Sequence, residues 1–222
     1  MLTVQYSIMN PNFQRAEKES PVRMSQAQNR HFRQQSLLRA AMKAVARYDI
    51  RGATVERICA EANASRGLIA HYFESKEALL LAALEDWFQT SFAIKRDIGG
   101  DHSLSAKQRI RAISLSSFST PAYSWENAAA WQAFTNASRH DRTYARSIRS
   151  ASRNVRRLTA SLFEKAAQEH GTEINAELFA KNLHALEDGL WNSLATGKDD
   201  LKVGEARKVC EQFINGCFLA NC

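Results

Sequence analysis

Apolar residues recur every three or four positions along most of this chain, and few residues interrupt that spacing. Such a repeat places apolar side chains on one face of an α-helix, whereas a half-buried β-strand would need alternation at every second position. The 222 residues include only three prolines and nine glycines, the residues that most often end helices. The pattern therefore predicts an all-α fold of about nine helices without strands.

We expect residues 1–28, which are polar and contain Pro11 and Pro21, to form a disordered or frayed arm. The predicted helices follow at 29–48, 54–62, 65–73, 75–96, 105–119, 124–138, 142–169, 175–196 and 202–219. Breaks are expected at Gly99, Gly100, Pro121, Gly171 and Gly197. After the arm, the prediction is a smaller part at 29–76 and a larger part at 77–222.

Positive charge is concentrated toward the N-terminal end, although Lys and Arg exceed Asp and Glu by seven over the whole chain. Residues 1–76 contain twelve Lys and Arg against six Asp and Glu, whereas residues 77–222 are nearly balanced. Because Lys and Arg displace counterions when they neutralise phosphates, this local excess favours a polyanionic partner such as nucleic acid. A solvated basic face is the alternative that charge alone leaves open.

Neither a membrane segment nor a metal or cofactor site is predicted. The longest apolar run, 79–84, is far shorter than the ~20 residues that span a bilayer, and the N-terminal arm lacks the apolar core of a secretory signal. The cysteines lack the CxxC spacing of zinc sites and redox pairs; they are Cys59, Cys210, Cys217 and Cys222. We therefore expect a cytoplasmic protein with reduced thiols.

Residues 54–73, TVERICAEANASRGLIAHYF, combine two short helical segments with a tight turn. Thr54 and Ser65 are good N-caps, and Asn63 tolerates the left-handed conformation that such a turn needs. The side chains expected to pack between the two segments are Ile58, Cys59, Ile69 and Phe73. This arrangement is a helix-turn-helix motif, whose second helix can enter the major groove of DNA.

Several polar and aromatic side chains of this stretch have no expected core role. Arg66 can donate two hydrogen bonds to guanine O6 and N7, while hydroxyl groups and charges near helix N-termini suit phosphate contacts. The expected DNA contacts are Arg33, Thr54, Ser65, Arg66, His71, Tyr72 and Lys76. Each has a purely structural alternative, with Tyr72 in the core, His71 on the surface and Lys76 as a solvated charge.

The segment SRGLIAHYFESKEALL, together with the helix at 54–62, resembles the DNA-binding domain of the TetR family of transcriptional regulators. The similarity covers residues 30 to about 90. It implies an all-helical homodimer with a DNA-binding domain at 29–76 and a ligand-binding and dimerisation domain at 77–222. Asn63 departs from the glycine usual at the turn, Ala64 is smaller than the usual valine, and Ala70 replaces a frequent aromatic residue.

Large aromatic residues gather after residue 76, and all four tryptophans lie there. With the acidic pair Glu187 and Asp188 they have the chemistry of a quaternary ammonium cage, in which aromatic faces and carboxylates hold a cation. The expected ligand-binding residues are Trp87, Phe88, Trp125, Trp131, Phe134, Tyr144, Asp188 and Trp191. Taken singly, each aromatic residue has the alternative interpretation of a large core side chain.

A second resemblance concerns the effector. The segments WQAFTNASRHDRTYARSIRSASRNVRRLTASLF and LEDGLW are similar to the C-terminal half of the choline-responsive BetI subgroup of this family. The similarity implies choline or a related cation as the small-molecule effector. Because ligand identity diverges quickly on a shared fold, the fold by itself does not determine it.

The last two predicted helices carry apolar residues at alternating spacings of three and four, which is typical of bundle seams. Two such helices from each of two chains would form a four-helix dimer interface. The residues expected there are Leu183, Leu186, Leu190, Cys210, Phe213 and Cys217. We interpret the two cysteines as packing residues, with a redox switch as the alternative.

Residues 139–157 contain seven arginines, and most fall opposite the apolar stripe of their predicted helix. We interpret this run as a solvated outer face, with an anion site as the alternative.

Taken together, these features favour a transcriptional repressor that a small effector releases from a palindromic operator. One alternative is an architectural DNA-binding protein without an effector, which predicts a solid core in place of a cavity. The other is an enzyme with an accessory DNA-binding domain. Because the histidines are scattered and no catalytic set is present, we assign no catalytic residue.

Overall fold

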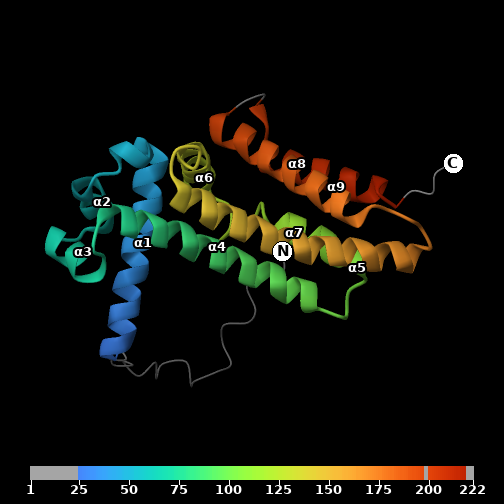
Figure 1. Ribbon diagram of the computed structural model, residues 1–222, viewed down its shortest axis with the longest axis horizontal. Helices are drawn as coiled ribbons and strands as arrows, with labels where there is room; N and C mark the ends of the chain where they lie inside the picture. Colours follow the sequence, from blue (N-terminus) through green and yellow to red (C-terminus); the bar gives the residue numbers. More distant parts are fainter. Residues whose placement is uncertain (1–24, 198–199, 219–222) are drawn as a thin grey trace, which may run out of the picture. The chain divides into compact units, whose positions relative to one another are not determined.

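The computed structural model describes residues 25–197 and 200–218 (Figure 1). Within these ranges the chain forms nine α-helices and no strand, so the all-α prediction is confirmed. The helices are α1 Gln26–Gly52, α2 Val55–Ala62, α3 Arg66–Tyr72, α4 Lys76–Gly100, α5 Ala106–Ser116, α6 Trp125–Ala137, α7 Arg142–His170, α8 Ala176–Thr196 and α9 Val203–Gly216. The expected arm lies mostly outside the described residues, although its last residues already belong to α1.

The chain divides into two compact units, residues 1–34 and residues 35–222. The described part of the first unit is 25–34, which forms the beginning of α1. The second unit contains the rest of α1 and the helices α2 to α9. Over the described ranges, no helix has the length and apolar character that crossing a membrane requires.

Side-chain caps begin the early helices where the sequence predicts them. The hydroxyl groups of Thr54, Ser65 and Ser75 each accept a hydrogen bond from the backbone N–H three residues later. Each bond satisfies a donor that the first helical turn leaves unpaired. Asn63 ends α2 in the left-handed conformation, with φ 47° and ψ 51°, so the tight turn also forms as predicted.

Gly99 and Gly100 do not end the fourth helix, contrary to the prediction, because α4 continues through both and ends before Asp101. A Cβ atom at Gly99 would lie 2.8 Å from Cδ1 of Leu158 on α7. The missing side chain therefore lets α4 approach α7 closely at this point. The Gly99 carbonyl, which has no helical partner so near the helix end, accepts a hydrogen bond from Arg109 Nη1 at 3.1 Å.

Two clusters of buried apolar side chains lie in the second unit. The first, here called the head core, joins α1, α2, α3 and the first half of α4 to Phe134 of α6 and Tyr144 of α7. The second, here called the second core, contains side chains from all five helices α5, α6, α7, α8 and α9. Trp87, midway along α4, packs against both clusters. The head core therefore extends beyond the boundary predicted at residue 76, and α4 runs from one cluster to the other (Figure 1).

Candidate functional site

The helix-turn-helix has the predicted apolar interior. Ile58 of α2 and Ile69 of α3 are buried, while Cys59 and Phe73 are half-buried against the same core. Burial raises the pKa of the Cys59 thiol, which keeps it in the uncharged form. This environment supports a packing role for Cys59.

The polar side chains of α3 lie mainly at the surface. Arg66 and His71 are exposed, and Tyr72 is half-buried with its ring edge-on to that of His71 at 5.0 Å. The Arg66 side chain is 71% exposed and forms a 2.6 Å ion pair with Glu56 of α2. Because water and salt screen such a surface pair, the guanidinium can exchange Glu56 for another acceptor at little cost.

The other expected DNA contacts take different positions. Thr54 and Ser65 cap α2 and α3. The Thr54 hydroxyl also forms a hydrogen bond with the Glu56 side chain, whereas the Ser65 hydroxyl keeps a proton to donate. Arg33 is an exposed residue of α1 in the first unit. The structure therefore brings Ser65, Arg66, His71 and Tyr72 together on α3 or its cap.

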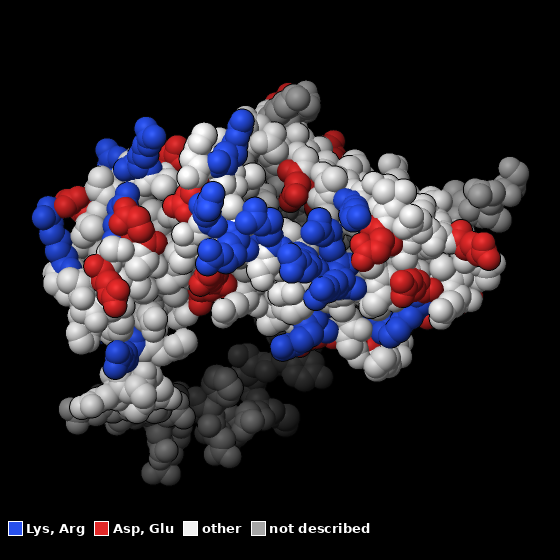
Figure 2. All heavy atoms as spheres, viewed as in Figure 1, with Lys and Arg blue, Asp and Glu red and all other residues white. Residues whose placement is uncertain are grey.

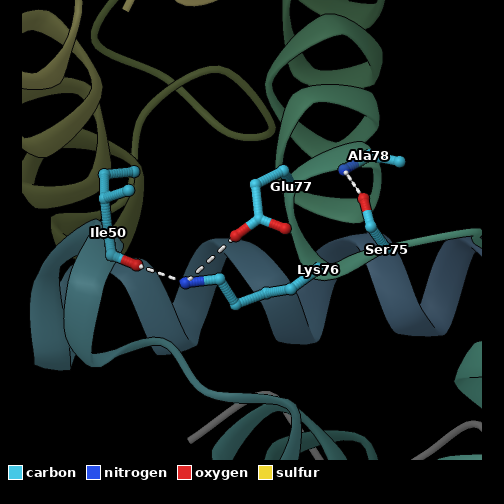
Figure 3. Close-up of polar contacts among 5 residues, drawn as sticks. All are labelled: Ile50, Ser75, Lys76, Glu77 and Ala78. Carbon is cyan, nitrogen blue, oxygen red and sulfur yellow. Dashed lines mark hydrogen bonds and ion pairs between the residues drawn. The ribbon is translucent and has the colours of Figure 1, made fainter. Parts of the chain in front are cut away.

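Lys76, expected as a DNA contact or a solvated charge, instead bonds to the main chain of another helix (Figure 3). Its side chain is only 23% exposed, and Nζ donates a hydrogen bond to the main-chain oxygen of Ile50 at 3.2 Å. Oε1 of Glu77 lies 3.6 Å from the same nitrogen. Ile50 follows a kink in α1 at Asp49, where φ is 60° and ψ is 173°. Lys76 therefore fastens the start of α4 to the end of α1.

A cavity of about 780 Å³ is lined by residues of α4, α6, α7 and α8 and by Ser117 and Ala122 from the segment between α5 and α6. Five of the eight expected ligand-binding residues line it: Trp87, Phe88, Trp131, Asp188 and Trp191. The ring centroid of Trp87 lies 5.1 Å from that of Phe88, 6.0 Å from that of Trp131 and 5.7 Å from that of Trp191. These four rings, here called the aromatic wall, offer the faces that bind cations.

The other three expected residues do not line the cavity. Phe134 and Tyr144 are buried in the head core with their ring centroids 5.2 Å apart. Trp125 is 49% exposed, and its Nε1 donates a hydrogen bond to the Ala195 oxygen at 3.2 Å. Trp131 precedes Phe134 by three residues on α6, but Trp131 packs against the second core and lines the cavity, while Phe134 is buried in the head core.

A buried polar network next to the aromatic wall was not predicted. Lys95 and Glu187 are only 7% and 9% exposed. Lys95 Nζ donates hydrogen bonds to Ser117 Oγ and, at 3.4 Å, to the main-chain oxygen of Ile113. Glu187 accepts hydrogen bonds from Ser114 Oγ at 2.7 Å and from Ser117 Oγ at 3.3 Å. Ser117 thus links the ammonium to the carboxylate, and their opposite charges make burial of both tolerable.

Burial opposes ionisation of both groups, so it lowers the pKa of Lys95 and raises that of Glu187, while their mutual attraction acts against both shifts. The sequence contains one signal for this network. Trp87, Ser91 and Lys95 follow one another at four-residue intervals, which places a lysine on the same helix face as a tryptophan.

Besides Glu187, two titratable groups of α8 with strongly shifted pKa values, His184 and Asp188, line the cavity. Desolvation by the surrounding protein raises the pKa of Asp188 to about 6, although its side chain still faces solvent. Desolvation, together with the charges of Lys95 and Arg156, lowers the pKa of His184 to about 4. Near neutral pH, Asp188 is therefore negatively charged and His184 is neutral.

Lys and Arg side chains form a band along α7 (Figure 2). Arg142, Arg149 and Arg153 are exposed, as predicted for a solvated face, and form no ion pair with a described carboxylate. Arg146 and Arg156, however, also line the cavity. The band therefore continues from the solvated surface to the cavity wall.

The six residues expected at a dimer interface fall into two groups. Leu183, Cys210 and Cys217 are buried within the chain itself, where α8 and α9 belong to the second core. Leu186, Leu190 and Phe213 are half-buried. Apolar residues at alternating spacings of three and four pack helices together both within one chain and between two chains. The spacing alone therefore does not tell buried core residues from interface residues. Burial raises the pKa of both thiols to about 11, which favours packing over redox chemistry.

Comparisons with known proteins match both parts of the chain. Residues 37–83 match the family described as bacterial regulatory proteins, tetR family. Residues 106–219 match the family described as BetI-type transcriptional repressor, C-terminal. The HTH-type transcriptional regulator BetI of Proteus mirabilis is 31% identical over 188 residues, covering 83% of this chain and 90% of the relative. The HTH-type transcriptional regulator BetI of Burkholderia mallei is 28% identical over 186 residues, covering 84% of this chain and 93% of the relative.

Solved structures with the same fold include a transcriptional regulator of Pseudomonas aeruginosa. It has a TM-score of 0.73 and 28% identity, covering 86% of this chain and 92% of that one. A regulator of Saccharomonospora viridis in complex with choline has a TM-score of 0.73 and 23% identity, with 83% and 96% covered.

Proposed function

Because this chain belongs to the tetR family of bacterial regulatory proteins and has a BetI-type repressor C-terminal region, we propose that two copies bind a palindromic operator until a small cation releases them. The chain is a BetI-type transcriptional repressor and not an enzyme. The observation that carries the proposal is the course of α4. This helix begins at Lys76 beside the helix-turn-helix and lines the cavity with Trp87 and Lys95.

In this proposal the DNA-binding domain is 29–76, and α3 enters the major groove. Arg66 exchanges its ion pair with Glu56 for guanine O6 and N7. Hydroxyl groups and positive charges at the helix starts and on α1 contact phosphates, which fixes the position of α3 without reading sequence. The proposed contacts are Arg33, Thr54, Ser65, Arg66, His71, Tyr72 and Lys76. Because its partner is operator DNA, the protein is expected to act in the cytoplasm.

The effector domain is 77–222, and its cavity is proposed to bind choline or a related cation. The aromatic wall supplies ring faces, and Asp188, ionised near neutral pH, supplies a negative charge. The choline complex of the Saccharomonospora viridis regulator supports this class of effector. The cavity also argues against an architectural protein without an effector, which would have a solid core.

The proposed coupling follows from two contacts of α4. At one end, Lys76 holds the helix to the main chain of α1. Further along, Trp87 packs against both cores and lines the cavity. An effector that displaces Trp87 therefore moves α4, and α4 moves the helices that Lys76 fastens to it. The two recognition helices of the dimer then no longer fit successive major grooves.

We further propose that α8 and α9 form the dimer interface. Leu186, Leu190 and Phe213 are half-buried in one chain and leave apolar surface for a partner, while Leu183, Cys210 and Cys217 support them from inside the core. A four-helix arrangement of α8 and α9 from two chains fits these positions.

The experiment begins with genome-wide recovery of DNA bound to the protein, which supplies the operator. The affinity of the purified protein for that duplex is then measured by fluorescence anisotropy with and without saturating choline. We expect the affinity to fall by about 5- to 150-fold, the range of typical allosteric couplings. Unchanged operator affinity, with choline binding demonstrated by calorimetry, would refute release of the operator by choline.

Lys76→Met supplies the test of coupling through α4, because it removes the hydrogen bond to Ile50 and keeps a side chain of similar length. The variant should bind choline as the unaltered protein does and bind the operator somewhat more weakly, because a proposed phosphate contact is lost. The fold-change in operator affinity that choline causes should be smaller than in the unaltered protein. Full release by this variant would show that α4 acts on the helix-turn-helix through other contacts.

A further inference from the structure

The side chains that α4 presents to the cavity change from aromatic to polar to charged along one face of the helix. Trp87, Ser91 and Lys95 are four residues apart, so they follow one another on the same helix face, and all three line the cavity. The wall therefore changes from an aromatic ring to a hydroxyl group and then to an ammonium group. A cavity for a simple cation needs only the first of these.

The polar end of this face has hydrogen-bonding capacity that the protein leaves unused. Ser91 Oγ is buried and has no hydrogen-bond partner among the described residues. Lys95 donates to Ser117 Oγ and to the Ile113 oxygen, which leaves one of its three N–H groups without an acceptor in the described part of the chain. A buried donor without a partner is costly, so a ligand oxygen that accepts from Ser91 and Lys95 would be stabilised here.

The charges around the cavity also fit an anionic group better than a second cation. The carboxylate of Glu187 already interacts with Lys95 through Ser117 and is therefore not free to balance a ligand. The remaining negatively charged residues of the lining are Glu85 and Asp188. The remaining positively charged ones are Arg146, Arg156 and Lys181. Positive groups outnumber negative ones, and the arginine band of α7 adds an attractive potential for anions near the cavity (Figure 2).

The aromatic and polar ends of the cavity meet at Ser117. Trp191 of the aromatic wall donates its indole N–H to the Ser117 main-chain oxygen at 3.1 Å, while the Ser117 hydroxyl accepts a hydrogen bond from Lys95. One small molecule can therefore contact both ends. The volume of about 780 Å³ lies within the range of roughly 300–1,000 Å³ that is usual for ligand pockets and leaves room for more than a small cation.

On the basis of the proposed function, we infer that the effector is a zwitterion with a quaternary ammonium group and an anionic group. The ammonium lies against the aromatic wall, and a carboxylate or phosphate accepts hydrogen bonds from Lys95 and Ser91. The anionic group distinguishes this ligand class from choline, whose hydroxyl carries no charge.

Tryptophan fluorescence of the full chain provides the measurement, because three of its four tryptophans line the cavity. The protein is titrated with choline, glycine betaine, carnitine and phosphocholine. We expect at least one zwitterion to bind about tenfold more tightly than choline, since its anionic group forms an ion pair with the Lys95 ammonium, whereas the choline hydroxyl accepts only a hydrogen bond. The ranking of the two carboxylates against phosphocholine identifies the anionic group.

Two variants test the residues. Ser91→Ala should lower the affinity for zwitterions about fivefold, through the loss of one hydrogen bond, and leave choline less affected. The double variant Lys95→Met with Glu187→Gln removes both charges together, so that neither remains buried alone, and should reduce the ratio of zwitterion to choline affinity to about one. Ser161→Ala removes an exposed hydroxyl of α7 outside the cavity lining and serves as the matched control.

The outcomes separate this inference from the function on which it rests. If choline binds as tightly as every zwitterion and the Ser91 and Lys95 variants leave the ratio unchanged, the inference is wrong while a cation effector stands. If no quaternary ammonium compound changes the fluorescence, thermal stability or operator affinity of the protein, the proposed effector class is wrong and the inference fails with it.

Discussion

The helix-turn-helix and the cavity differ in the range of the contacts that build them. Residues 54–73 are shaped by neighbours in the chain, through caps three residues apart and a turn at Asn63. The cavity is lined by residues from four helices and from the segment between α5 and α6, and its polar network joins Lys95 to Ser117 and Glu187. Because local contacts shape the helix-turn-helix, a short stretch of sequence is enough to recognise it. The groups that the cavity offers to a ligand depend instead on which helices, distant in sequence, pack together.

The two regions also expose their functional groups differently. Arg66 reaches solvent and is held by a surface ion pair that it can leave at little cost. Lys95 is buried and depends on Glu187 through Ser117, so removing either charge leaves the other uncompensated. Single substitutions should therefore separate function from stability on α3, but not in the buried network.

The largest expected effect tests whether α6 really contributes to two regions. Phe134→Ala removes a fully buried ring from the head core and should lower the free energy of unfolding by about 3–5 kcal/mol. Trp131→Ala, one turn earlier, removes a half-buried ring of the cavity and should cost less stability while weakening choline binding more. Urea denaturation and calorimetry measure both. Equal losses of stability would contradict the separation of the two sides of α6.

A smaller effect is expected for the exposed residues of α3, and it concerns operator affinity. Arg66→Ala should weaken binding to the specific operator by about 1–3 kcal/mol and relax its preference for that sequence. Thermal stability should hardly change, because the side chain is 71% exposed. Anisotropy titrations with operator and random duplexes decide the matter. An equal loss on both duplexes would reassign Arg66 to the phosphate backbone.

The smallest effect concerns the charge of Asp188. Its pKa of about 6 means that it is mostly protonated at pH 5 and mostly charged at pH 7.5, so choline affinity should fall about threefold on acidification. The other titratable groups of the cavity lining are Glu85, Lys95, Arg146, Arg156, Lys181, Glu187 and His184, and His184 stays neutral. Calorimetry at the two pH values measures the change, and Asp188→Asn should remove most of it. A pH dependence that survives in the variant would instead identify Glu187 as the titrating group.

The sequence predicts the all-α fold, the caps and the helix-turn-helix because periodicity and capping are local properties. Of the residues it proposes for ligand binding, Trp87 and Trp191 do line the cavity, since aromatic residues are recognisable by type. It could not separate Phe134 from Trp131, because rotation about a helix axis is set by the packing of neighbouring helices. Lys95 was missed for a related reason: a lysine in a helix is normally solvated, and only the approach of Glu187 makes its burial possible.

The hydrogen bond from Lys76 to Ile50 has a consequence for how such repressors can diversify. Its acceptor is a main-chain oxygen, which residue 50 presents whatever its side chain. The joint between α1 and α4 therefore places no demand on side chains at the end of α1 or on the recognition face of α3. A lineage could exchange its operator preference by surface substitutions, or a chimera could receive a foreign helix-turn-helix, without changing the joint through which we propose that the cavity signals.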